Sequence, residues 1–449
     1  MQQTQNFTEG KIFAPLIRFA MPVLLALLLQ TMYGAVDLMV VGQFGTAADV
    51  SAVSTGSMIM RTVTVIITGL SMGLTVIMGR KIGEKKQEEA GQIIGTSIWL
   101  FGVLAIVLTV VMVAAAPAAT RWMQAPAEAF DKTVSYTVIC SIGTLFIVGY
   151  NLVGSIFRGI GDSTVPLITV AIASVLNVFG DLLLVAVVPM GAAGAAIATA
   201  AAQAVSVILS LVVIRKRQLP FTFRIKDIRP RADYIRQILL LGIPIALQDL
   251  LVSISFLFVG AIVNALGVTV SAGVGVAEKL SGFIMLLPSA FSQSMSAFVA
   301  QNMGAGKPDR ARKALLCGIC SSFAIAIVMA YLSFFHGDWM SALFAKNPEV
   351  IIASFEYLKA YAVDTLLTAF LFCFIGYFNG TGDTLFVMLQ GVLGAFCVRL
   401  PVSWIVSRQS WATLFYIGLA TPASTLVQII LCGFYFAWTM RKQRQQLHK

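Results

Sequence analysis

The chain has 449 residues, of which 58% are hydrophobic and only 11% are charged. This composition excludes an ordinary soluble domain, in which roughly 25% of residues are charged. The formal net charge is +11, but the basic residues concentrate in loops between apolar segments, and no basic folded face is apparent. We therefore expect a membrane protein with no nucleic-acid partner.

Hydropathy predicts twelve membrane-spanning helices. Residues 98–119 contain no ionisable group and are long enough to cross the ~30 Å hydrocarbon core of a bilayer. The first apolar stretch is longer than a signal-peptide core and is flanked by Lys11 and Arg18, so it is typical of a retained helix. In chain order, the predicted spans are 13–39, 50–78, 92–116, 132–156, 164–188, 191–214, 235–262, 270–299, 314–335, 352–377, 385–406 and 413–440.

One layout of residues occurs twice, 221 residues apart. The segment Gly159–Asp162 has its counterpart in Gly380–Asp383 at this offset, and Gly83 has its counterpart in Gly304. Because matching residues from different parts of each half are separated by the same number of residues, the pattern indicates a duplicated unit. Duplicated membrane units are typical of transporters that bind substrate between their halves, and an even number of spans per half indicates parallel repeats.

The predicted fold class is an all-α polytopic membrane protein, with twelve transmembrane helices in two pseudo-symmetric six-helix lobes. The N-terminal lobe covers 1–214, a basic cytoplasmic linker covers 215–234, and the C-terminal lobe with a basic cytoplasmic tail covers 235–449. With both termini in the cytoplasm, the inner segments hold 23 of the 31 basic residues and the outer loops hold four. This bias follows the positive-inside rule. We expect an integral cell-membrane protein of a prokaryote, with basic loops attracted to membrane lipids.

Ionisable groups inside a span are unfavourable and point to function. Asp37 lies in the first predicted span and Asp181 in the fifth, where Asn177 precedes it by four residues and therefore shares its helix face. Ala195 and Thr199 share a face of the sixth span by the same spacing. At ~1.5 Å per residue, counting from the ends of the spans places these groups at one depth.

Two carboxylates, an amide oxygen, a hydroxyl and a backbone carbonyl at one level would suit a hard cation. They would equally suit a proton, since burial and a second carboxylate both favour a neutral aspartic acid. At the corresponding positions of the second half, the repeat places Val259, Val398 and Val402. The cluster is therefore confined to one half, which favours an ion-binding role over the alternative, a structural hydrogen-bond network.

Several motifs along the chain point to one family of transporters. They are Pro22 fifteen residues before Asp37, Asn177-x-x-x-Asp181 with Thr199, Arg158-Gly-x-Gly-Asp162, Gly242-Ile-Pro244 and Gln301-Asn302-x-Gly304-Ala-Gly306-Lys307. In these motifs the chain resembles the multidrug and toxic compound extrusion (MATE) family across nearly its whole length. The resemblance implies a V-shaped pair of six-helix lobes that exports small amphipathic cations against Na⁺ or H⁺. It also implies that Asp37, Asn177, Asp181, Ala195 and Thr199 bind the coupling ion, with Na⁺ possible at the four polar residues.

The second half carries its own charges within predicted spans. Some family members have a glutamate near position 252, where this chain has Val252, one turn after Asp249. The remaining charges are expected at similar depth, which predicts paired charges lining the cleft. They would form structural ion pairs or contact a cationic substrate, and both alternatives stay open. With one further polar residue of the first lobe, the substrate or cleft candidates are Asn151, Asp249, Glu278, Lys279, Asp364 and Arg399.

The favoured function is a cation-coupled antiporter that exports amphipathic, mostly cationic drugs or toxic compounds by alternating access. The alternative is a flippase for a lipid-linked precursor, whose pyrophosphate would favour a basic cavity, whereas most charges within the spans are acidic. A membrane enzyme would need a convergent nucleophile–base or metal set, and none is found in the sequence; nor is a nucleotide-binding loop. We expect a monomer whose partners are small cationic molecules, with no cofactor apart from the coupling ion.

The charge bias predicts which loops face the cytoplasm. In a background without native cysteines, cysteines introduced at positions 225 and 309 should react with an impermeant thiol reagent only from the cytoplasmic side. A cysteine at position 48 should react only from outside. Labelling of intact cells and of inside-out vesicles measures both, and the reverse pattern would overturn the orientation.

Overall fold

The computed structural model describes residues 7–216, 220–221 and 223–447. The chain divides into two compact units. One comprises Met1–Ala246 and Ala300–Lys307, and the other comprises Leu247–Val299 and Pro308–Lys449. The expected linker includes positions 217–219 and 222, which lie outside the described residues, as do the two chain ends.

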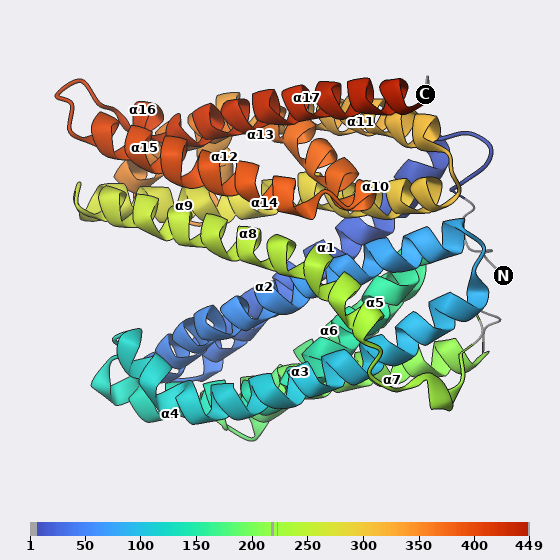
Figure 1. Ribbon diagram of the computed structural model, residues 1–449. Helices are drawn as coiled ribbons and strands as arrows, with labels where there is room; N and C mark the ends of the chain where they lie inside the picture. Colours follow the sequence, from blue (N-terminus) through green and yellow to red (C-terminus); the bar gives the residue numbers. More distant parts are fainter. Residues whose placement is uncertain (1–6, 217–219, 222, 448–449) are drawn as a thin grey trace. The chain divides into compact units, whose positions relative to one another are not determined.

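The first unit is built from long helices joined by short connections (Figure 1). Its helices are α1 (Phe13–Phe44), α2 (Ala47–Gly83), α3 (Gln87–Trp122), η1 (Ala127–Ala129), α4 (Phe130–Ile142), α5 (Thr144–Gly159), α6 (Thr164–Asp181), η2 (Leu182–Val187), α7 (Gly191–Lys216) and η3 (Ile225–Asp227). The next helix, α8 (Ala232–Asn264), begins in this unit and ends in the second.

The second unit continues in the same style. Its helices are α9 (Val268–Ile284), α10 (Leu286–Gly304), α11 (Pro308–Phe335), α12 (Gly337–Ala342), α13 (Pro348–Thr381), α14 (Thr384–Val392), η4 (Leu393–Arg399), α15 (Leu400–Ser407), α16 (Leu414–Gly418) and α17 (Ala420–Leu447). The end of α10 belongs to the first unit. No strand occurs among the described residues.

The predicted spans are confirmed as apolar helical segments. Within the described ranges, eleven helical segments are long and apolar enough to cross a membrane. The pair Ala127–Ile142 and Thr144–Gly159, bent by 43° at its break, makes a twelfth when taken as one span. Side chains such as Ile106 and Val110 of α3 are more than half exposed, as befits a face that meets lipid rather than water.

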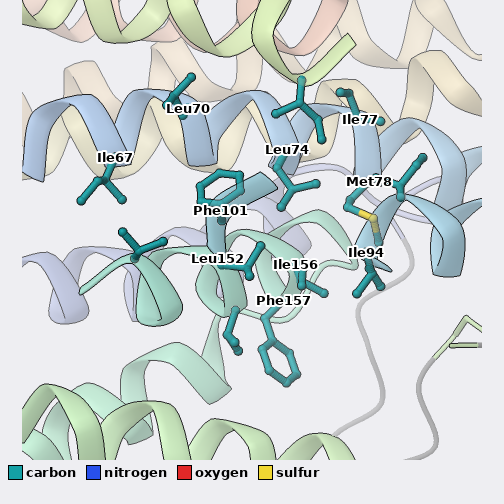
Figure 2. Close-up of a cluster of buried hydrophobic side chains, with 14 of the residues drawn as sticks. Ile67, Leu70, Leu74, Ile77, Met78, Ile94, Phe101, Leu152, Ile156 and Phe157 are labelled. Carbon is teal, nitrogen blue, oxygen red and sulfur yellow. The ribbon is translucent and has the colours of Figure 1, made fainter. Parts of the chain in front are cut away.

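The core of the first unit lies where α2, α3 and α5 meet. From α2, Ile67, Leu74 and Met78 are buried at a spacing that places them on one helix face. They pack against Phe101 of α3 and Phe157 of α5 (Figure 2). The other faces of α2 are also largely apolar. Hydrophobicity alone therefore does not distinguish its buried face from its other faces, and the packing of the side chains does.

The internal repeat is visible as a repeated contact. In the first unit, the hydroxyl of Thr75 donates a hydrogen bond to the carbonyl oxygen of Ser155 at 3.2 Å. In the second, the hydroxyl of Ser296 donates to the carbonyl oxygen of Gly376 at 3.0 Å. Each donor and each acceptor is separated from its counterpart by 221 residues, so the two halves use the same helix pairing.

Matching glycine turns follow these helices. Gly161 and Gly382 have φ values of +84° and +88°, in the left-handed region that glycine adopts most readily. In both turns the next residue donates its N–H to a carbonyl five residues earlier, at 2.9 Å and 2.8 Å. Both segments thus end one helix and direct the chain into the next one.

Two repeat-related glycines also meet each other's helices. A Cβ atom on Gly83 would lie 2.0 Å from the carbonyl oxygen of Gln301, and one on Gly304 would lie 2.1 Å from the carbonyl oxygen of Arg80. The side chain of Gln301 also donates to the carbonyl oxygen of Gly159 at 2.8 Å. These contacts explain why residues 300–307 group with the first unit.

Small residues at the repeated contact predict a matched stability effect. A Cβ on Gly159 would lie 2.6 Å from Met78 Cβ, and one on Gly380 would lie 2.7 Å from Val299 Cβ. Gly159→Ala and Gly380→Ala should each destabilise the protein by about 1–3 kcal/mol through overpacking. Gly102→Ala is the control, because no atom outside the adjoining backbone of its own helix lies within 4 Å of its added Cβ. Thermal unfolding in detergent measures the effect, and equal midpoints for all three variants would contradict it.

Candidate ion-binding site

The buried polar cluster of the first unit is built by α1, α6 and α7. Asp37 is only 2% exposed, and Asn177, Asp181 and Ala195 are fully buried. Asn177 and Asp181 lie one helical turn apart on α6, as their spacing predicts. Because the surrounding helices are largely apolar, these side chains have few partners other than one another.

Hydrogen bonds link the cluster across the three helices. Thr199 of α7 donates its hydroxyl to Asp37 Oδ2 at 2.8 Å. Asn177 Nδ2 donates to Thr199 Oγ1 at 3.3 Å. Asp181 lies close enough to Asp37 for a direct electrostatic interaction. The structure therefore brings together four of the five residues that the depth argument had placed at one level, and Ala195 lies in a buried apolar cluster with Val40 and Val185.

Four oxygen atoms of this cluster are buried without a hydrogen-bond partner. They are Asp37 Oδ1, Asn177 Oδ1 and both carboxylate oxygens of Asp181. Buried polar atoms are usually satisfied, so an orphaned set needs an explanation such as a bound ion. An all-oxygen donor set with two negative charges is the chemistry that hard cations prefer, and it can equally accept a proton.

The local backbone brings α6 and α7 into close contact. A Cβ on Gly180 would lie 2.9 Å from Ala198 Cβ, and one on Gly194 would lie 2.8 Å from the carbonyl oxygen of Leu184. Directly after Asp181 the helix widens into the π-helical turn η2, a feature often found at functional sites. These small residues let Asn177 approach Thr199, so they support the site without contributing ligands.

Sequence reasoning missed the tyrosine beside the cluster. Tyr33 lies four residues before Asp37 on α1, and its hydroxyl donates to the carbonyl oxygen of Val170 at 3.1 Å. Tyr33 and Asp37 are electrostatic neighbours. Three residues earlier, Gln30 donates to the hydroxyl of Tyr150 at 2.8 Å. The helical spacing of these polar residues along α1 was the available signal.

Sequence reasoning also missed a buried aspartate outside this cluster. Asp49 accepts hydrogen bonds from the N–H and hydroxyl of Thr46, from Lys132 at 2.8 Å, and from the N–H of Ala192 at the start of α7. It thereby caps α2 and ties it to α4 and α7. The signal was the pattern Thr46-x-x-Asp49 ahead of an apolar run, which is typical of a capping box.

The second unit holds two buried charges with neutral partners. Asp364 accepts a hydrogen bond from Thr425 at 2.6 Å. Arg399 donates to Ser255 at 2.9 Å, and its guanidinium carbon lies 4.1 Å from the ring centre of Phe256. Both side chains are at most 5% exposed. Besides these hydroxyl and aromatic partners, Asp364 and Arg399 interact electrostatically with each other.

Among the described residues, the charged cleft candidates of the second half form no ion pair at contact distance. Glu278, Lys279 and Asp249 are exposed, and none of them has an ion pair within the part of the chain that the structure describes. Consecutive residues of a helix point about 100° apart, so Glu278 and Lys279 cannot both face one partner. Asn151 is half-buried and donates to the carbonyl oxygen of Ile147 on its own helix, so no hydrogen bond joins it to the aspartate cluster.

Repeated apolar spans with carboxylates buried among them are typical of polytopic membrane transporters. The MatE family model matches the chain twice, over residues 22–183 and 244–405. These segments make up more than half of the chain, and they lie one in each half. The chain belongs to the MatE family, which confirms both the resemblance and the internal duplication.

Curated relatives match over nearly their full length. Probable multidrug resistance protein YpnP of Bacillus subtilis is 26% identical over 434 residues, or 96% of each chain. Probable multidrug resistance protein YoeA of the same organism is 24% identical and covers 98% of this chain and 97% of its own. Multidrug export protein MepA of Staphylococcus haemolyticus is 22% identical, with 99% and 97% covered.

Solved structures share the fold. An outward-facing multidrug resistance MATE family transporter of the MOP superfamily superposes with a TM-score of 0.92 at 19% identity, covering 99% of this chain and all of the other. A MOP superfamily transporter from Pyrococcus furiosus, described as having a binding pocket of reverse polarity, gives a TM-score of 0.91 at 20% identity and covers both chains fully. These likenesses confirm the predicted fold class.

Proposed function

We propose that this transporter is a cation-coupled antiporter that exports amphipathic, mostly cationic compounds by alternating access. One observation carries the proposal: in the aspartate cluster of the first unit, two buried carboxylates and an amide hold four buried oxygen atoms without a hydrogen-bond partner. A buried carboxylate without a counter-charge is unfavourable by several kcal/mol. Binding Na⁺ or a proton would offset this, and both fit the donor set.

The coupling follows from where the ligands lie. Asp37 belongs to α1, Asp181 to α6 and Thr199 to α7. With the cluster neutralised, the three helices can approach closely; with it vacant, the two carboxylates repel each other. A ligand shifts a conformational equilibrium only by its differential affinity for the two states. Binding of an ion at this cluster therefore biases the arrangement of three helices. Thr199 donates a hydrogen bond to one carboxylate oxygen of Asp37, so the other oxygen can bind the ion.

The substrate class rests on the relatives and on one exposed acid. YpnP, YoeA and MepA are named for multidrug resistance or multidrug export, and we extend this role to the present chain. Glu278 is exposed on α9, where it is available to a cationic compound. The lipid-linked precursor flippase is not favoured by these comparisons.

The setting proposed for this activity is a prokaryotic cell membrane. The distribution of basic residues favours cytoplasmic termini, with basic loops close to lipid headgroups. We propose a monomer, because the duplication places both repeats within one chain. No cofactor is required apart from the coupling Na⁺ or H⁺.

Loss of either aspartate should uncouple export. Asp37→Asn and Asp181→Asn should each lower gradient-driven ethidium uptake into everted vesicles about tenfold or more, since losing a charged ligand exceeds the ~1.4 kcal/mol that corresponds to a factor of ten. Thr199→Ala should have a milder effect, because it removes one neutral ligand. Imposing a Na⁺ gradient and a pH gradient separately identifies the ion. Asp131→Asn, at an exposed acid of α4, is the control, and wild-type rates in both aspartate variants would refute the coupling role.

Glu278 tests the substrate contact. Glu278→Gln should leave the thermal midpoint unchanged, because the carboxylate forms no ion pair with any described residue. It should weaken binding of cationic compounds about fivefold while sparing neutral ones, as expected for about 1 kcal/mol from one partly solvated charge pair. Glu349→Gln, at an exposed acid in the first turn of α13, is the matched control. Lower stability with unchanged cation affinity would instead assign Glu278 a structural role.

A further inference from the structure

A cavity of about 720 Å³ lies at one end of the spans of the first unit. Its wall is formed by the last turn of α2, the first turns of α3, and the residues that begin α8. By the charge bias this end faces the cytoplasm, so the cavity lies at the level of the lipid headgroups. It is separate from the aspartate cluster, and the proposed antiport does not use it.

The cavity presents two arginines whose charges are only weakly compensated. Lys81 is already paired with Glu84 at 2.9 Å and Glu89 at 2.8 Å. Arg231 reaches Asp227 only at 3.5 Å. Within the described part of the chain, Arg236 has no ion pair. Two guanidinium groups on one wall are suited to a phosphate, because their fixed donors match its oxygen atoms.

The same wall carries an acid and neutral hydrogen-bonding groups. Asp233 is exposed in the cavity and has no ion pair among the described residues. Tyr234 donates its hydroxyl to Gln92 Oε1 at 3.3 Å, and Arg231 lies 6.0 Å from the tyrosine ring centre. A ligand that satisfies this wall carries both a phosphate for the arginines and a hydrogen-bond donor for Asp233.

An apolar track leads out of the cavity along α8. Leu240, which lines the cavity, is 61% exposed, and Ile243 is 50% exposed. Arg236, Leu240 and Ile243 follow each other at spacings of four and three residues, so they share one face of α8. The charged residue thus lies near the end of the span, and the exposed apolar residues follow it along the helix. A phospholipid has the same order, with a charged headgroup followed by apolar acyl chains.

We propose that this cavity binds a glycerophospholipid whose headgroup carries a hydrogen-bond donor, such as phosphatidylethanolamine or phosphatidylglycerol. Arg231 and Arg236 hold the phosphate, Asp233 accepts from the ammonium or hydroxyl group, and an acyl chain lies along Leu240 and Ile243. Phosphatidylcholine supplies the phosphate but no donor, so it fits only half of the site.

Native mass spectrometry of the purified full chain tests the site. The protein is titrated with phosphatidylethanolamine, phosphatidylglycerol and phosphatidylcholine of identical acyl chains, and with inorganic phosphate. The first two lipids should bind more tightly than phosphatidylcholine. Arg236→Gln should weaken their binding about fivefold, the loss expected for one basic residue at a membrane surface. Lys226→Gln, at an exposed base of η3 outside the cavity, is the control and should bind like the wild type.

Asp233→Asn separates the two halves of the headgroup site. It should reduce the preference for phosphatidylethanolamine over phosphatidylcholine and leave phosphatidylcholine binding unchanged. Equal losses in Arg236→Gln and Lys226→Gln would show general attraction to charge and overturn the proposal. It would also be overturned if inorganic phosphate displaced the lipids at equal concentration, since the site would then recognise a free anion, or if all three lipids bound equally.

Discussion

A chain that crosses lipid must satisfy its own backbone hydrogen bonds, because the hydrocarbon core offers no water. This constraint makes every described span helical, and contact with lipid favours apolar side chains over most of the outer helix surface. Hydrophobicity then cannot decide which faces pack together. Helix contacts in this protein depend on small residues instead, as where Gly159 meets Met78 and Gly180 meets Ala198. The glycines thus determine the helix arrangement on which the polar cluster depends.

The sequence was sufficient for the spans, the duplication and the aspartate cluster. Spans follow from apolar length, and the cluster follows from a fixed rise per residue, which places Asp37 and Asp181 at one depth. Depth does not give the rotation of a helix about its axis. For this reason the sequence left Asp364 and Arg399 between structural pairing and substrate contact, and it did not predict Thr425 and Ser255 as their hydrogen-bond partners. The π-helical turn after Asp181 has no hydropathy signal, so it could not be predicted.

The two repeats share their framework but not their chemistry. The hydroxyl-to-carbonyl bond from Thr75 recurs at Ser296, so the helix pairing is the same in both halves. Asp37, Asn177 and Asp181 have valines at the corresponding positions, while the second half carries the oppositely charged and buried Asp364 and Arg399. One half thus concentrates uncompensated negative charge, and the other stabilises its charges internally. A duplicated framework of this kind lets one repeat specialise without altering the packing of either.

The reciprocal contact of Gly83 and Gly304 has an evolutionary consequence. After a duplication, each copy is ordinarily free to diverge while its twin retains the original function. Here each glycine lies against the backbone of the other copy, so a side chain added to either would disturb both. A substitution at either glycine is therefore constrained by the other copy, and the two positions evolve together. Other corresponding positions, such as Asp37 and Val259, carry different residues, and the asymmetry of the two halves arose at positions of this kind.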